Sequence, residues 1–222
     1  MANPDRPRGL TPVRHANGGS WNNALAEIAV PDDATIDEDA TWGAIFIGDP
    51  VVLSGTNALA GKLGHLPMVA PLIDEQDEAG TDLIYGVVVG IGRPGETQDG
   101  SNEFGMFNPD SLTTNYITGA EVEADTDGFV LYVAPAADWI FEAQTSTLEL
   151  CRVGTGLDTS ITAATVAHGN TSTGRSTVEL TNDETGDQFT VVAVPEYVDN
   201  DAELINARVH VMAKRDLTVN AT

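Results

Sequence analysis

Residues 128–144, GFVLYVAPAADWIFEAQ, decide the fold class of this chain. Two apolar runs, 128–135 and 139–145, are rich in aromatic and β-branched residues. The first run ends in proline, and the short segment 136–138 with an aspartate separates the two. Runs of this length and composition between turn-forming residues are typical of β-strands. The stretch therefore predicts a β-protein.

The rest of the chain repeats this pattern. Further candidate strands are 24–30, 43–48, 50–55, 82–92, 148–153, 176–180, 188–195 and 207–213. Clusters of Gly, Pro, Asp and Asn lie between them at spacings of about eight to twenty residues, which is typical of sandwiches and barrels. Helical signals are limited to two short stretches without caps at both ends. We expect an all-β fold, a jelly-roll-like sandwich or barrel.

The first twenty residues differ from the remainder. They contain Arg6, Arg8 and Arg14, although the chain has only ten Lys and Arg and a net charge of −24. Three prolines and a Gly-Gly pair in the same stretch exclude a regular helix and remove backbone donors from any strand. We therefore predict an extended N-terminal arm over residues 1–20.

Residues 21–222 should form a β-rich body. We expect the Thr-, Ser- and Gly-rich stretch 154–174 to be a long loop, which divides this body if the last strands pack separately. Alternatively, the last strands complete the first sheet. The body is strongly acidic, with 32 Asp and Glu against four Lys and Arg between residues 16 and 207. Because nucleic-acid binding depends on Lys and Arg that neutralise phosphates, we expect no nucleic-acid partner.

Composition also bears on the environment of the protein. Apolar residues make up 41% of the chain, which is enough for a buried core. The longest apolar segment, 83–92, is too short to cross a bilayer, so we expect no membrane partner and synthesis in a host cytoplasm. Only two residues are lysines, while Asp and Thr are abundant. This balance resembles that of halophilic proteins, in which salt screens a large net charge.

Sequence motifs for nucleotide binding or catalysis match this chain only poorly. GIGRPG (90–95) is not followed by a helix, and GTNALAGK (55–62) departs from the spacing of a phosphate loop, so neither predicts a nucleotide site. The four histidines are isolated, no nucleophile elbow is present, and the lone Cys151 has apolar neighbours. We expect no catalytic residue and no enzymatic activity.

Carboxylates cluster at 32–39, 74–78 and 199–203. Calcium binds six to eight oxygen ligands in adaptable geometry, so these loops could supply them. None of the clusters fits a calcium-loop pattern, and no His or Cys spacing suggests zinc. We expect these carboxylates to lie in solvent-exposed loops and to form no metal site, and we expect no cofactor. Calcium binding in the acidic loops is the alternative.

Several short motifs carry a resemblance to a known family. In chain order they are Arg6-Pro7, Gly9-Leu10, Pro12–His15 with the following Gly-Ser-Trp, Gly48–Val51, Gly86–Gly90, Asp138 with Phe141–Gln144, and Ser172–Ser176 leading to Glu179-Leu180. Together they resemble head decoration (cement) proteins, found beside the major capsid protein in tailed viruses. The resemblance implies a β-rich structural protein of the virion on the outer surface of an icosahedral capsid, which it stabilises. It carries over no catalytic residue.

The arm is the expected contact with the major capsid protein. Arginines form bidentate pairs with carboxylates, apolar side chains fill pockets, and prolines reduce the entropy lost on docking. The expected capsid-binding residues are Arg6, Pro7, Arg8, Leu10, Pro12, Val13, Arg14, His15 and Trp21. Without residues 1–20 the body should stay folded but no longer bind the capsid. Repeated weak contacts favour a homo-oligomer, and a disordered terminus is the alternative for the arm.

A second function class remains open at this stage. The same β-body could be a turret, spike or glycan-binding module on the viral head, with Trp42 or Trp139 as a platform for a sugar ring. A hydrolase has the least support, because no base lies beside a candidate nucleophile in the sequence.

Overall fold

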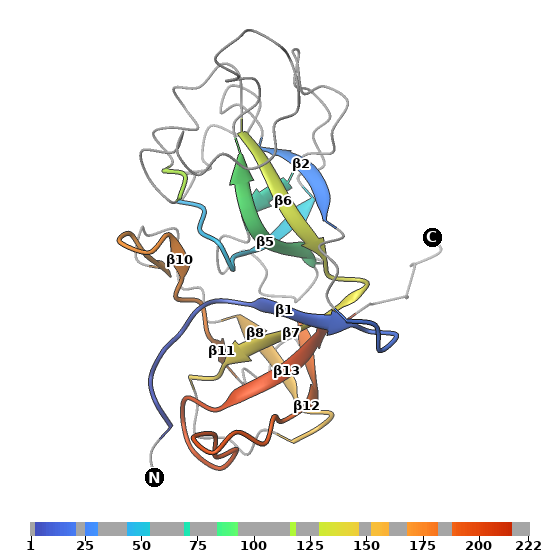
Figure 1. Cartoon of the computed structure of the whole chain (residues 1–222), viewed down its shortest axis with the longest axis vertical. Coiled ribbons are helices and arrows are strands. Elements are labelled where there is room, and N and C mark those ends of the chain that lie inside the picture. Colours follow the sequence, from blue (N-terminus) through green and yellow to red (C-terminus); the bar gives the residue numbers. More distant parts are fainter. Residues whose placement is uncertain are drawn as a thin grey trace, which may run out of the picture.

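The structure is a computed structural model that describes residues 3–20, 25–30, 44–53, 69–71, 84–92, 116–118, 129–146, 152–159, 168–181 and 188–214. In these residues all thirteen regular elements are β-strands, which confirms the predicted all-β fold. The strands form open antiparallel sheets (Figure 1). Of the two predicted architectures, the open sheets agree with a sandwich and not with a closed barrel.

Sheet A, in the lower half of Figure 1, has six strands and contains both the first and the last strand. Each strand is antiparallel to its neighbours. In spatial order the strands are β1 (Thr11–His15), β7 (Trp139–Gln144), β13 (Arg208–Ala213), β12 (Phe189–Ala193), β8 (Gly156–Thr159) and β11 (Leu180–Thr181).

Sheet B, in the upper half of Figure 1, has five antiparallel strands. In spatial order they are β2 (Ala26–Val30), β6 (Phe129–Pro135), β5 (Ile84–Gly92), β3 (Pro50–Leu53) and β4 (Val69–Pro71). A separate two-stranded ribbon consists of β9 (Gly169–Asn170) and β10 (Arg175–Ser176).

The chain passes from sheet B to sheet A within the stretch 128–144. Strand β6 ends at Pro135 and β7 begins at Trp139 in the other sheet. The amide of Asp138 donates to the carbonyl of Pro135 (3.1 Å), and the amide of Ala136 donates to the carbonyl of Tyr85 in β5 (2.8 Å). This turn ties β7 to sheet B, so one connection sets the position of both sheets.

Two apolar clusters form the core. One lies mainly under sheet A around Trp139, Phe141 and Phe189, and it also includes Val87 and Ala134 of sheet B. The other lies on sheet B around Phe129 and packs Ile and Val side chains from several strands. Burying one such side chain stabilises the fold by about 1.5–3 kcal/mol. The clusters follow from the period-two alternation of the strands.

The predicted strands agree with the structure except at three places. In the predicted strand 43–48, the described residues 44–48 form only isolated bridges, at Ile45 and Ile47, and Gly48 turns the backbone with φ +101°. The predicted strand 176–180 is two short strands, β10 and β11. In the predicted strand 148–153, residues 148–151 lie outside the described part, and 152–155 form a turn in which the amide of Arg152 donates to Thr155 Oγ1 (3.2 Å).

Sequence patterns did not indicate four of the strands. Strand β1 was expected to be irregular arm, β8 and β9 lie in the stretch expected to be a loop, and β4 is only three residues long. Strands β12 and β13 pair within the sheet that also contains β1 and β7, so in the described residues the last strands complete that sheet.

Candidate functional site

The N-terminal arm, here residues 3–10, lies against sheet A of its own chain. Asn3 is only 7% exposed, and its side chain fixes the start of the arm. Its Nδ2 donates to the carbonyls of Asp201 (2.8 Å) and Ile205 (3.0 Å), and its Oδ1 accepts from the amide of Asp201 (2.7 Å). The arm therefore begins on the loop between β12 and β13.

Gln144 at the end of β7 holds the middle of the arm. Its Oε1 accepts from the amide of Arg6 (2.9 Å), and its Nε2 donates to Asp5 Oδ1 (3.0 Å) and Glu179 Oε1 (2.7 Å). The pKa of the Glu179 carboxyl is raised, mainly by burial. The hydrogen bond from Gln144 lowers this pKa, and the nearby charge of Asp5 raises it. One amide side chain therefore connects three segments distant in sequence.

Gly9 and Leu10 join the arm to the core. The amide of Leu10 donates to the carbonyl of Gly48 (2.9 Å), and the Leu10 side chain is 1% exposed within the sheet A cluster. Gly9 has φ +64°, and a Cβ there would lie 2.6 Å from both the Gly48 oxygen and the Ser176 Cβ. Only glycine fits this close approach.

After the arm, β1 forms the edge of sheet A. Its pairing with β7 shifts register between Pro12 and Arg14, a bulge in an edge strand where proline is tolerated. The His15 ring stacks on the Trp139 ring, with centroids 3.6 Å apart. The strand ends in a turn in which the amide of His15 donates to the carbonyl of Gly19 (2.8 Å).

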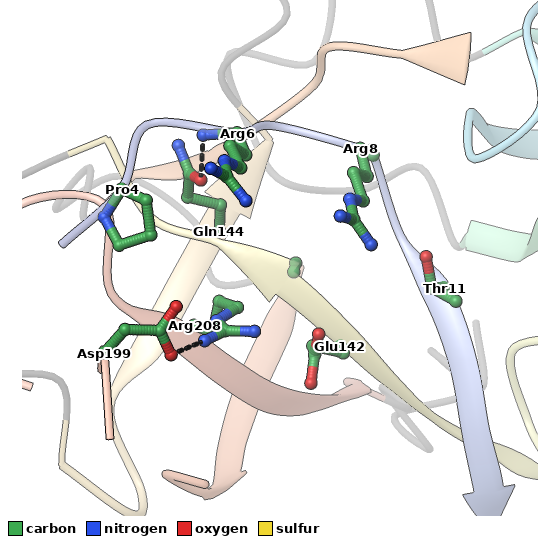
Figure 2. A pocket seen from close by; sticks show the side chains of 10 residues that line it. Pro4, Arg6, Arg8, Thr11, Glu142, Gln144, Asp199 and Arg208 are labelled. Carbon is green, nitrogen blue, oxygen red and sulfur yellow. Dashed lines mark hydrogen bonds and ion pairs between the residues drawn. The ribbon is translucent and has the colours of Figure 1, made fainter. Parts of the chain in front are cut away.

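A cavity of about 110 Å³, here called the arm pocket, lies between the arm and the outer face of sheet A. Its walls are Pro4, Arg6, Arg8, Gly9 and Thr11 on the arm side, Glu142, Ala143 and Gln144 of β7, and Asp199 and Arg208. Figure 2 shows Arg6 and Arg8 extending from the arm toward β7, and Arg208 extending from β13 into the same space.

The arginines of the pocket differ in their partners. The Arg208 guanidinium forms an ion pair with Asp199 and lies over the Tyr197 ring, 4.3 Å from its centroid. Arg6 and Arg8 are exposed, and among the described residues their guanidiniums have no ion-pair partner. In the described structure the guanidiniums of Arg6 and Arg8 therefore lie beside the pocket without a carboxylate partner, in a chain with a net charge of −24.

Glu142 interacts with groups other than the Arg6 and Arg8 guanidiniums. Its Oε2 accepts from the Tyr197 hydroxyl (2.9 Å) and lies 3.5 Å from His210 Nε2, too far for a well-aligned hydrogen bond. The His210 ring is the main cause that lowers the pKa of the Glu142 carboxyl, helped by Tyr197 and Arg208 and opposed by burial. The hydrogen bond to Glu142 raises the pKa of the Tyr197 hydroxyl. Glu142 is therefore ionised near neutral pH.

The structure brings together only some of the predicted arm residues. Arg6 and Arg8 face the arm pocket, whereas Arg14 is exposed in β1 and is not part of the pocket wall. Leu10 was expected to fill a pocket on a partner, but it lies in the core of its own chain. The remaining predicted residues are partly buried along the arm and β1, namely Pro7, Pro12, Val13 and His15, while Trp21 lies outside the described residues.

The expectation that residues 1–20 can be removed from a folded body does not agree with these contacts. Their removal would take Leu10 out of the core and Asn3 from its hydrogen bonds, and it would uncover the edge of β7. An exposed strand edge is also prone to aggregation. The arm therefore belongs to the folded body.

Sequence patterns missed most of the sheet side of the pocket. In β7 and β13 the alternation places Glu142, Gln144, Arg208 and His210 on the polar faces, and this signal is visible in WIFEAQ and RVHVMA. The pairing of Glu142 with His210, and of Gln144 with Arg208, depends on which strands are neighbours. Period-two patterns carry no information about that choice.

A second polar cluster lies where the arm, sheet B and the β9–β10 ribbon meet. Asp49 is 2% exposed, and its Oδ2 accepts from the amide of Phe46 (2.7 Å) and lies 3.2 Å from His168 Nε2. The Phe46 and His168 rings pack edge to face. These contacts join Phe46 and Asp49 to the residue before β9, and among the described residues Asp49 Oδ1 is buried without a hydrogen-bond partner.

Other candidate sites find little support in the described residues. Trp139 is 1% exposed, so it cannot be the platform for a sugar ring, and Trp42 lies outside the described part. Cys151 and the clusters 32–39 and 74–78 also lie outside it. In the described ranges no group of three or more His, Cys, Asp and Glu is placed to hold a metal ion.

Comparison of the chain with protein-family models, with curated proteins and with solved structures finds no match. In the part that the structure describes, no helix is long and apolar enough to span a membrane.

Proposed function

We propose that the protein is a capsid decoration or cement subunit that binds the outer surface of an icosahedral viral head and stabilises it. The observation that carries the proposal is the placement of Arg6 and Arg8 on an ordered surface of an otherwise acidic molecule. Complementary charge between two surfaces favours encounter and fixes their orientation. The role requires no catalysis, and the major capsid protein is the proposed partner.

The segments that carry the family resemblance support this proposal because they lie together. Gly9 approaches both Gly48 and Ser176, and Gln144 bonds to Glu179. The arm therefore acts as part of a preorganised surface, and little conformational entropy is lost when a partner binds. Avidity among copies of a homo-oligomer would strengthen contacts that are individually weak.

Cosedimentation with viral heads tests the proposal. Heads stripped of the protein are incubated with the wild-type chain, with the Arg6→Gln/Arg8→Gln double variant, and with Arg152→Gln, a charge control at an exposed turn away from the arm pocket. We expect the wild type and the control to sediment at a fixed ratio to the major capsid subunit, and the double variant to lose at least about tenfold in affinity.

Absence of the protein from intact heads would contradict the proposed function. Equal binding by all three chains would locate the contact with the head elsewhere on the molecule. Thermal release measured on decorated and bare heads shows whether bound protein also stabilises the shell, as a cement subunit should.

A further inference from the structure

We propose that the arm pocket is a binding site for a carboxylate group, supplied by an Asp or Glu side chain of an acidic segment of the partner protein. This inference rests on the proposed function for the identity of the partner, but its chemistry rests on the pocket alone.

The first argument is the charge that remains uncompensated. Arg208 is paired with Asp199, and Glu142 accepts a hydrogen bond from the Tyr197 hydroxyl. Arg6, whose backbone amide donates to Gln144, and Arg8 both project into the pocket, as Figure 2 shows. A guanidinium presents its donors in a planar fork that matches a carboxylate, so two of them beside one cavity form a preorganised acceptor site.

The second argument distinguishes a carboxylate from a phosphate. Glu142 and Asp199 also line the cavity, and the pKa of Glu142 is held below its ordinary value, so the negative charge of Glu142 persists at neutral pH. A phosphate group carries about −1.5 to −2 charges at pH 7, and although the guanidiniums attract it more strongly, the net charge of −24 over the whole chain also repels it more than a singly charged carboxylate. The net charge of −24 disfavours a nucleic-acid backbone further.

The third argument concerns the class of molecule that carries the carboxylate. Large exposed hydrophobic side chains in the described residues are Val153, Tyr197, Val198 and Ile205, and the last three lie on the β12–β13 loop, which also carries Asp199. Tyr197 contacts both Glu142 and Arg208 of the site, and the carbonyl of Ile205 binds Asn3 of the arm. A charged anchor beside apolar side chains is typical of a protein interface and suits an acidic peptide better than a free anion.

Binding of model peptides tests this inference without the viral head. The probe is a blocked hexapeptide with a central Asp between Leu and Val residues, and the matched control peptide carries Asn instead of Asp. Arginine side-chain Nε–Hε resonances are followed by NMR during titration, in the wild type and in the Arg6→Gln, Arg8→Gln and Arg152→Gln variants. Inorganic phosphate serves as competitor.

We expect the Asp peptide to shift the Arg6 and Arg8 resonances and the Asn peptide to bind at least about tenfold more weakly. Arg6→Gln and Arg8→Gln should each weaken the Asp peptide by a similar factor, and Arg152→Gln should not. Because Arg6 and Arg8 are exposed, the variants should retain the wild-type fold, which circular dichroism checks.

Three results would overturn the carboxylate site. Equal affinity for the Asn peptide would leave only apolar binding, displacement by phosphate at equimolar concentration would make the pocket a phosphate site, and unshifted arginine resonances would exclude an anion site.

Peptide binding with no binding to heads would refute the proposed function but would still support a carboxylate site in the arm pocket. Head binding that survives both arginine substitutions would place the partner elsewhere.

Discussion

Leu10 contributes more to the fold than a residue so near the N-terminus usually does. Its side chain is 1% exposed, and it belongs to the same cluster as Trp139, Phe141 and Phe189. Gly9 makes this burial possible, because its backbone approaches Gly48 too closely for any side chain. At the scale of single residues, the Gly9-Leu10 pair is therefore what joins the arm to the core.

Replacement of Leu10 by Ala should lower the free energy of unfolding by about 2–5 kcal/mol, because it removes buried methyl groups and leaves a cavity. Urea denaturation followed by tryptophan fluorescence measures the loss. Val153→Ala is the control, since Val153 is 69% exposed and its truncation should change stability by less than about 0.5 kcal/mol. Equal stability of both variants would show that Leu10 is not a core residue.

Glu142 makes a pH-dependent contribution to stability. Because its pKa is lowered in the folded chain, its contribution is fully present above the ordinary pKa and is lost as pH falls through the lowered value. Glu142→Gln should cost about 1 kcal/mol near neutral pH, and this difference should vanish in acid. Denaturation of both chains across the acidic range measures it.

Glu179→Gln is the matched control for Glu142→Gln, because the two carboxyls have pKa shifts of opposite sign. The pKa of Glu179 is raised, so the folded chain binds its proton more tightly and stability falls as pH rises through the window above the ordinary pKa. The Gln variant should therefore gain stability relative to wild type at neutral pH. The same sign for both variants would contradict the assignment of opposite shifts.

At the scale of elements, the arm is an irregular segment that behaves as part of sheet A. Gln144 bonds the Arg6 amide and Asp5, Asn3 bonds the β12–β13 loop, and β1 then pairs along β7. Proline content predicted an extended segment, and residues 3–10 form neither helix nor strand. Composition alone did not reveal that the segment lies on its own body, because a free arm and a docked arm have the same local preferences.

Replacement of Gln144 by Ala should release the arm locally, since it removes the hydrogen bonds to Arg6, Asp5 and Glu179. Limited trypsin digestion should then cut after Arg8 at least several times faster than in the wild type, because cleavage follows the population of the open form. Gln188→Ala is the control, as Gln188 bonds Thr159 and not the arm. Unchanged cleavage after Arg8 would show that Gln144 does not hold the arm.

At the scale of the whole molecule, the dominant property is the excess of carboxylates. The net charge of −24 repels itself across the folded chain, and its screening length falls from about 30 Å at 10 mM salt to about 3 Å at 1 M. The protein should therefore gain stability with salt. We expect the Tm to rise by several degrees between these limits, where 1 kcal/mol corresponds to about 2–4 °C.

Thermal denaturation in sodium chloride from 10 mM to 1 M measures this dependence. Matched concentrations of an uncharged solute separate screening from exclusion effects at the protein surface. A Tm that is identical at both salt limits would argue against a halophilic protein.

The all-β class, most strand positions and the acidic character were set by the sequence itself, because period-two alternation and net charge are local or summed properties of the chain. The arm pocket was decided only by the tertiary structure. Arg6 lies 138 positions from Gln144 in the sequence. Arg208 lines the same pocket because β13 pairs with β7, which places Arg208 opposite Gln144. Strand pairing depends on contacts between distant segments, and no pattern within one strand specifies its neighbour.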